Sequence, residues 1–292
     1  MRPGPATRSS AWRRAARLAR IQGQRQSHQV PLLHRQRGLL RGLRIALLLL
    51  LLVVVALGQW QARVLVTAWE SPLWVVLHPL AADGSEVAAQ NVAMLDAERV
   101  APLEAFFARE ARRHGVAIEQ PVVVRIGSVP ESPPPLPPVD GGALGIAWWS
   151  LKLRYWAFAL DADGLPADVR LAVRYFDPER SRRLPHSLGL AEARVGIVNA
   201  FADQDYHGSN RVVIAHELLH TLGASDKYDP GSNLPRYPDG YAEPKREPRH
   251  PQQLAELMGG RIPLGNGEAR MPTSLDDVVI GTASAREIRW LE

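Results

Sequence analysis

The strongest constraint on the fold is a short stretch beyond the middle of the chain. Residues 211–223 read RVVIAHELLHTLG, in which His216 and His220 stand four positions apart. On a helix, residues at this spacing project from one face, so the two imidazoles can occupy two corners of a tetrahedral metal site. Glu217 follows the first histidine and lies close to the open coordination position. The stretch therefore predicts a helix that carries a metal site with a carboxylate beside it.

A histidine pair at this spacing also arises by chance, often on an exposed helix face. The neighbours argue against chance here, because Val212 to Ala215 precede the pair and Leu218 and Leu219 lie within it. A helix that is apolar nearly all round is expected to be buried. Burial of two histidines and a glutamate without partners is costly, and a bound metal removes that cost. We therefore expect this helix to bind a metal.

The third ligand of the predicted site is Asp226. No cysteine is present in the chain, so the ligands must come from His, Asp, Glu or backbone oxygen. Gly223 can adopt a positive φ and turn the chain sharply under the helix, which carries Asp226 back toward the metal. The complete string over residues 216–226 is H-E-x-x-H-x-x-G-x-x-D.

This string resembles the extended motif of the metzincin metallopeptidases, whose last position is His or, in some branches, Asp. The match is specific over residues 216–226 and loose elsewhere. It implies a zinc ion (Zn²⁺) held by three ligands: His216, His220 and Asp226. It also implies hydrolysis of a peptide or protein substrate by a zinc-activated water, with Glu217 as general base. An edge strand before the metal-binding helix should pair with extended substrate, and Ala193 to Phe201 is the expected strand.

Metzincins also have a methionine turn beneath the metal, and Met258 in AELMGG is the candidate here. On sequence alone, Met258 fits nearly as well as a side chain that fills a gap in the core. The chain departs from the pattern two residues later, where some metzincins have Tyr and this chain has Gly260. Three tyrosines could supply a phenol to the oxyanion instead: Tyr228, Tyr237 and Tyr241. Tyr228 is the first choice because it is closest to the ligand set.

Other side chains stay open as ligands of this metal or of a second one. A different zincin clan would place its third ligand on a second helix, in the part of the chain that holds Glu243, Glu247 and Glu256. The prolines of residues 236–251 argue against a helix there, which leaves Glu256 as the alternative. Three residues of an acidic loop could bind calcium or a second zinc, although such loops are usually only solvated: Asp203, Asp205 and His207.

The positive charge of the chain is concentrated at its N-terminus. Residues 1–44 hold 11 arginines and no acidic residue, so the remaining 248 residues carry 24 basic and 30 acidic side chains. The net charge of +5 comes from this tail, and the folded part therefore gives no support to nucleic-acid binding. We expect residues 1–42 to form a basic, disordered cytoplasmic tail.

Residues 45–58 read IALLLLLLVVVALG, a run of 14 residues without a polar side chain. A membrane span needs about 20 residues, which this run reaches if Arg41 and Arg44 extend toward the interface. A cleaved signal peptide would have a much shorter basic region, and a buried core helix normally keeps a polar face. We therefore predict a transmembrane signal anchor over residues 43–62. The arginines place the N-terminus in the cytoplasm and residues 64–292 outside it, in the periplasm or at the cell surface.

Residues 64–292 alternate between helical and extended patterns. The predicted helices cover residues 91–114 and 209–222, and the predicted strands cover residues 73–77, 122–126, 153–160, 169–176 and 193–201. Residues 131–142, ESPPPLPPVDGG, predict an exposed loop. The pattern favours one α/β or α+β domain. With the resemblance it implies a zincin-like or metzincin-like catalytic domain with a twisted mixed sheet, two long helices and an irregular C-terminal part, preceded by one transmembrane helix.

These features combine into the prediction of a membrane-anchored zinc-dependent peptidase. Two alternatives stay open: a non-catalytic extracytoplasmic module that binds peptides and holds a structural zinc, and a zinc hydrolase of a non-peptide amide. A structural zinc usually has four protein ligands and no carboxylate poised beside it, so Glu217 favours an enzyme. The preference for peptide substrates rests on the resemblance alone.

The ligand set also predicts an acid limit to activity. His216 and His220 must be neutral to bind a metal, and an ordinary histidine has a pKa of about 6.5. Protons therefore compete with the metal as the pH falls, and we expect hydrolysis to fail below about pH 6. The measurement is a pH–rate profile. A rate that stays flat or rises down to about pH 5 would contradict the assignment of these two ligands.

Overall fold

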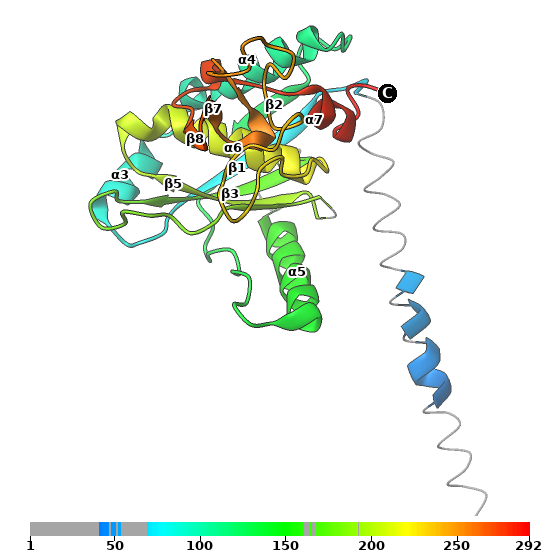
Figure 1. Ribbon diagram of the computed structural model, residues 1–292. Helices are drawn as coiled ribbons and strands as arrows, with labels where there is room; N and C mark the ends of the chain where they lie inside the picture. Colours follow the sequence, from blue (N-terminus) through cyan, green and yellow to red (C-terminus); the bar gives the residue numbers. More distant parts are fainter. Residues whose placement is uncertain are drawn as a thin grey trace, which may run out of the picture. The chain divides into compact units, whose positions relative to one another are not determined.

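The computed structural model describes residues 41–46, 48–50, 52–53, 69–160, 164, 167–191 and 193–292. The chain divides into two units, residues 1–59 and residues 60–292, and the sheet and helices discussed below belong to the second unit (Figure 1). Most of the predicted tail and much of the predicted anchor lie outside the described residues, so their boundaries stay predictions. Within the described part of the chain, no helix combines the length and the apolar character that a membrane crossing requires.

A five-stranded mixed sheet forms the centre of the second unit, which confirms the prediction of a mixed sheet. Its strands are β1 (Leu73–Ala81), β2 (Val122–Ile126), β3 (Val169–Phe176), β4 (Leu188–Leu190) and β5 (Val195–Phe201). The strand order is β2-β1-β3-β5-β4. Strands β1, β2, β3 and β5 run parallel, and their nearly continuous apolar residues are typical of strands that are covered on both faces. Strand β4 runs antiparallel to β5 and forms one edge of the sheet.

Helices cover both faces of this sheet. They are α3 (Glu86–Ala93), α4 (Ala97–Arg113), α5 (Gly142–Ala159), α6 (His207–Thr221) and, near the C-terminus, α7 (Thr282–Glu287). Alternation along β3 and β5 directs Val173 and Val198 into the main core with α4 and α6, and Ala172 and Ile197 into a second core with α5. Figure 1 shows α5 on the side of the sheet opposite to α6.

Two predicted elements differ from the structure. The prediction of a strand over residues 153–160 is wrong, because most of this stretch belongs to α5. A short, mostly apolar stretch such as LRYWAFAL fits a strand or an apolar helix equally well, and only the full length of the element separates them. The single helix predicted over residues 91–114 is two helices, because the Asp96 carboxylate caps α4 by accepting a hydrogen bond from the Arg99 amide at 3.0 Å.

The Pro-rich segment that the sequence predicts as a loop has an irregular backbone. Residues 127–141 form neither helix nor strand, and this loop is fastened to α5 through two indole nitrogens. Trp149 Nε1 donates to the Pro135 carbonyl at 2.8 Å and Trp156 Nε1 donates to the Ser132 carbonyl at 2.9 Å.

After α6 the strands are short: β6 (Ala255–Glu256), β7 (Ile262–Gly265), β8 (Glu268–Arg270) and β9 (Val278–Val279).

Candidate metal centre

Helix α6 holds the first two predicted ligands in the interior of the domain. Leu218 and Leu219, which lie between the histidines, are almost completely buried in the main core. The helix ends where the sequence predicts, because Gly223 adopts a φ of +99°, a conformation that side chains with a Cβ rarely adopt. This turn brings the following segment, with Asp226, back against the end of the helix.

His216, His220 and Asp226 converge on one point. The Nε2 atoms of His216 and His220 each lie 3.2 Å from Oδ1 of Asp226. Within the described residues these three form a group whose ligand atoms all lie within 4.8 Å of one another, which is the spacing that a bound metal ion requires. Two imidazole nitrogens and one carboxylate oxygen match the ligand types that zinc takes in catalytic sites. The structure therefore brings together the three ligands predicted from the sequence.

Backbone carbonyls orient both imidazole rings. His216 Nδ1 donates to the Leu257 carbonyl at 2.9 Å, and His220 Nδ1 donates to the Ala224 carbonyl at 2.8 Å. In the neutral form of each ring, which is the form that binds a metal, Nδ1 carries the proton and Nε2 presents its lone pair to the point of convergence. Hydrogen bonds from the outer nitrogen are the usual means by which proteins fix the tautomer and direction of a metal-binding histidine.

The charges of this group also suit a cation. Burial opposes a charged imidazole at His216, but its hydrogen bond to Asp226 and the charge of Glu217 outweigh burial and raise the pKa of His216. Burial likewise opposes the charge of Asp226, but the two imidazoles outweigh it and hold the pKa of Asp226 far below its ordinary value. A carboxylate that stays ionised between two imidazoles is a donor set that a divalent cation can bind.

Glu217 lies beside the ligands in a water-poor position. Glu217 is only 5% exposed, and its Oε2 has no hydrogen-bond partner among the described residues. Burial raises the pKa of Glu217, and the nearby His216 and His220 act in the opposite direction. A buried carboxylate with an open acceptor atom and a raised pKa next to a metal-ligand set is typical of a general base.

Tyr228 contacts two of the candidate ligands, His216 and Asp226. Its ring centroid lies 6.4 Å from that of His216. Burial, the charge of Asp226 and a hydrogen bond to that carboxylate raise the pKa of Tyr228 to about 12. The phenol therefore remains protonated at neutral pH and can donate a hydrogen bond. Tyr237 and Tyr241 instead pack edge to face on each other, with 5.4 Å between ring centroids.

The turn that carries Met258 lies under α6. Residues Leu257–Gly259 form a short 3-10 helix, and its Leu257 carbonyl is the acceptor that orients His216. Met258 is completely buried in the main core, and its carbonyl accepts from the Lys227 amide at 2.8 Å. Met258 thus fills the core and also ties the turn to the segment that follows Asp226. Sequence reasoning missed the contribution of the Leu257 carbonyl, because a backbone acceptor leaves no residue-type signal.

The remaining alternative ligands are engaged elsewhere. Glu256 is completely buried, and its carboxylate accepts from the amides of Gly259 and Gly281 and from the Ser284 hydroxyl, so it is structural. Glu243 pairs with Arg246 at 3.0 Å on the surface. In the part of the chain that the structure describes, the group that could hold a metal includes none of the other candidates: Asp203, Asp205, His207, Glu243, Glu247 and Glu256.

The strand predicted to pair with substrate does not lie at the edge of the sheet. Strand β5, at Val195–Phe201, is an inner strand between β3 and β4, so the assignment of Ala193 to Phe201 as the edge is wrong. The edge is β4 at Leu188–Leu190, a strand too short to show alternation. Gly189 lies directly against α6, because a Cβ there would come within 2.5 Å of the Glu217 carbonyl and 2.7 Å of the His220 Cβ.

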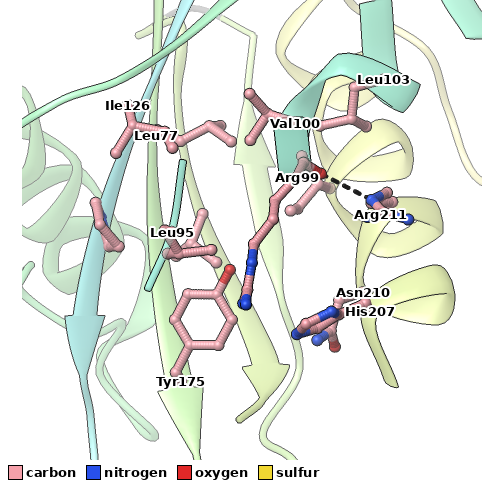
Figure 2. A pocket seen from close by; sticks show the side chains of 13 residues that line it. Leu77, Leu95, Arg99, Val100, Leu103, Ile126, Tyr175, His207, Asn210 and Arg211 are labelled. Atoms are coloured by element: carbon pink, nitrogen blue, oxygen red, sulfur yellow. Dashed lines mark hydrogen bonds between the residues drawn. The ribbon is translucent and has the colours of Figure 1, made fainter. Parts of the chain in front are cut away.

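A separate small cavity lies between α4, α6 and the sheet, and none of the three candidate ligands lines it (Figure 2). Its volume is about 30 Å³, enough for a few water molecules at most. Arg99 and Tyr175 reach into it, and Arg211 Nε donates to the Arg99 carbonyl at 2.9 Å. Burial raises the pKa of Tyr175 to about 12 against the opposing charges of Arg99 and Arg211, so this phenol stays neutral. The cavity is an interior space and is too small for a peptide.

Comparison with known proteins finds only distant likeness. No family model matches the chain, and no curated protein matches it significantly. The crystal structure of wild-type OgpA from Akkermansia muciniphila matches with a TM-score of 0.39 and 16% identity, over 75% of this chain and 59% of that chain. Catalytically inactive OgpA in complex with an O-glycopeptide (glycodrosocin) substrate matches with a TM-score of 0.32 and 14% identity over the same shares. This chain therefore spans less than two thirds of OgpA, and likeness at these TM-scores establishes neither a shared fold nor a shared function.

Proposed function

We propose that this protein is a membrane-anchored, zinc-dependent peptidase. The observation that carries the proposal is the convergence of two imidazole Nε2 atoms on the Asp226 carboxylate, 3.2 Å from each, beside a buried glutamate with an open acceptor atom. A structural site would need a fourth protein ligand and would have no use for a poised base. The resemblance of residues 216–226 to the metzincin motif supports the same reading.

The donor set fits zinc. His216, His220 and Asp226 supply three ligands of the nitrogen and oxygen types, which leaves a coordination position for water or substrate. Both Nδ1 atoms already hydrogen-bond to backbone carbonyls, so the Nε2 atoms are the ones available to bind the metal. When bound, zinc would lower the pKa of a water molecule and polarise the carbonyl that is attacked.

The side chains around the ligands divide the proton transfers between them. Glu217 accepts a proton from the attacking water through its open oxygen and then delivers it to the leaving amine. Tyr228, kept protonated by a pKa of about 12, donates a hydrogen bond to the oxyanion that develops on the attacked carbonyl. Its position next to Asp226 supports this role.

The substrate that fits this arrangement is an extended peptide or protein segment. Strand β4 leaves one edge of the sheet open, and Gly189 on this strand packs against the backbone of α6 at Glu217. A peptide that pairs with β4 would therefore pass the ligands at the end of the same helix. The absence of a side chain at Gly189 allows the strand to approach this closely.

The location of the protein is also part of the proposal. The apolar run of residues 45–58, preceded by arginines, supports a signal anchor over residues 43–62 with the N-terminus in the cytoplasm. Residues 64–292 would then be extracytoplasmic, either periplasmic or at the cell surface. Protease protection of the full chain in spheroplasts and intact cells tests this orientation.

Asp226→Ala is the variant that tests the metal site. We expect about one zinc per wild-type chain and cleavage of a mixed peptide library, whereas the variant should lose both. Loss of a side chain that only hydrogen-bonds to a metal ligand weakens metal binding by about 10–100-fold. Removal of a ligand itself should weaken zinc binding by more than this. The measurements are metal content after dialysis and peptide cleavage by mass spectrometry, made on the full chain.

Asp229→Ala is the matched control, because Asp229 lies three residues further on, is exposed and takes no part in the ligand group. It should keep zinc and activity. Zinc retained in Asp226→Ala would remove Asp226 from the ligand set. Zinc without cleavage in the wild type would replace the peptidase with a binding module or a hydrolase of another amide, and no zinc would refute the proposal.

A further inference from the structure

Helix α5 is apolar on two opposite faces. One face packs on the sheet: Trp149, Leu153, Trp156 and Ala157 belong to the second core. The other face carries five large apolar side chains that point to solvent: Leu144 (88% exposed), Trp148 (60%), Leu151 (56%), Tyr155 (74%) and Phe158 (72%). We call these five residues the outer stripe of α5.

The outer stripe is a continuous line along the helix. Its members are spaced by four, three, four and three residues, which places them on one side of an α-helix. The rotation of about 100° per residue puts this side opposite to the side that packs on the sheet. Among the described residues, the loop of residues 127–141 accepts hydrogen bonds from the buried indoles of Trp149 and Trp156 and leaves the stripe exposed.

An exposed stripe of this size requires a partner. A helix that is apolar all round is normally buried in a protein core or in a membrane, and soluble monomers rarely expose such large contiguous apolar patches. Tyrosine and tryptophan, which form part of the stripe, are the aromatic residues that favour the boundary between lipid and water. The composition of the stripe therefore fits a lipid surface.

The charge around the stripe selects the kind of surface. Lys152 and Arg154 flank it on its two sides, and α5 contains no acidic residue. The same face of the sheet carries a further guanidinium, Arg174, whose Nη1 donates to the Asn199 side-chain oxygen at 2.9 Å. Cations beside an apolar stripe are typical of helices that lie in the interface of anionic bilayers, where they can reach the headgroups.

A second copy of the chain is a poorer occupant. If two outer stripes packed together, the flanking Lys152 and Arg154 of each helix would face the cations of the other. No carboxylate on α5 could compensate for this, and like charges beside a helix–helix seam destabilise it. An anionic bilayer instead satisfies the apolar stripe and both cations at once.

We propose that α5 is an interfacial helix whose outer stripe lies in the surface of an anionic lipid bilayer. This inference rests neither on the proposed peptidase activity nor on the predicted anchor. Because α6 packs on the opposite face of the sheet, α5 bound to lipid would direct the metal site away from the bilayer. The bilayer would then fix the orientation of the domain and leave the metal site accessible to substrates away from the lipid.

The absence of cysteine makes the test direct, because a single introduced cysteine is the only site that a thiol-reactive label can modify. The full chain is prepared with Tyr155→Cys or Phe158→Cys, labelled with an environment-sensitive fluorophore and reconstituted with phosphatidylserine-containing vesicles. Lipids brominated on their acyl chains serve as quenchers. Ala105→Cys is the matched control, because it is an exposed position on α4, which packs on the other face of the sheet.

Labels at positions 155 and 158 should shift to the blue and lose about half or more of their emission, since interfacial helices bury their apolar face about 5–10 Å deep. The label at position 105 should show neither effect. In Lys152→Gln/Arg154→Gln chains, or in vesicles of phosphatidylcholine alone, the quenching at position 155 should fall clearly.

Four outcomes would overturn the inference. The first is no quenching at positions 155 and 158 in chains that float with the vesicles. The second is a label that is shielded from water but not quenched by lipid, which would assign the stripe to another part of this chain. The third is energy transfer between labelled copies without lipid quenching, which would assign it to a dimer. Quenching that is equal in neutral vesicles would refute the anionic surface.

Discussion

The Glu217→Gln variant is expected to keep its zinc and to lose peptide hydrolysis by a factor of about 10² to 10⁴, the usual contribution of a general base. Glutamine has nearly the same shape and volume as glutamate but cannot take a proton from water. The side chain sits in a buried position with one open oxygen, so the substitution changes the chemistry more than the packing. Since the metal ligands are separate side chains, zinc content should stay at the wild-type value.

The split between kcat and KM distinguishes this role from a role in substrate binding. Loss of a base that acts only in the transition state lowers kcat and kcat/KM together, whereas loss of a binding contact mainly raises KM. Glu243→Gln is the matched control, because Glu243 forms only a surface ion pair with Arg246. Its activity should be close to that of the wild type. Full activity in Glu217→Gln would remove Glu217 from the mechanism.

The candidate site could be predicted from the sequence because its information is local. His216 and His220 are fixed relative to each other by the period of one helix, and Asp226 follows after a single glycine turn. In such a case the spacing of residue types is nearly sufficient to define the geometry. Tyr228 follows Asp226 by two positions, and the structure places its phenol in a hydrogen bond with that carboxylate; its role toward the oxyanion stays a prediction.

The parts that sequence reasoning missed depend on contacts between distant segments. The Leu257 carbonyl orients His216 across 41 positions, and no residue type announces a backbone acceptor. Strand β4 has three residues and is recognised only from its pairing with β5. Part of helix α5 is predicted as a strand because its apolar residues occupy two faces, which removes the helical period from the pattern. That loss of period is the same property that marks its outer stripe.

Glu256→Ala is expected to destabilise the domain at the turn that supports the metal site. The completely buried carboxylate accepts from the Gly259 amide at 2.7 Å, the Gly281 amide at 3.0 Å and the Ser284 hydroxyl at 2.7 Å. Alanine leaves three donors without an acceptor, and two of them, the Gly259 amide and the Ser284 hydroxyl, are buried. A buried donor without an acceptor costs about 1–3 kcal/mol, so we expect a loss of about 3 kcal/mol or more. For a domain of this size that loss lowers the Tm by roughly 6–12 °C.

The effect should extend to zinc. Glu256 caps the 3-10 turn whose Leu257 carbonyl orients His216, so a loosened turn leaves that imidazole less well directed. Glu256→Gln separates the two consequences: its one oxygen can still accept from Gly281 and Ser284, while its amide N–H groups face the Gly259 amide. This variant should stay folded, with a smaller drop in Tm and with zinc affinity reduced by about 10-fold or more.

Calorimetry and zinc titration of Glu256→Ala, Glu256→Gln and Glu243→Ala check these expectations. Glu243→Ala should match the wild type in both, because an exposed ion pair contributes at most about 1 kcal/mol. A Glu256→Gln chain with lowered Tm and unchanged zinc affinity would show that Glu256 stabilises the fold without acting on His216. An unchanged Tm in Glu256→Ala would mean that the three donors find other acceptors, and the buried network would then not support the site.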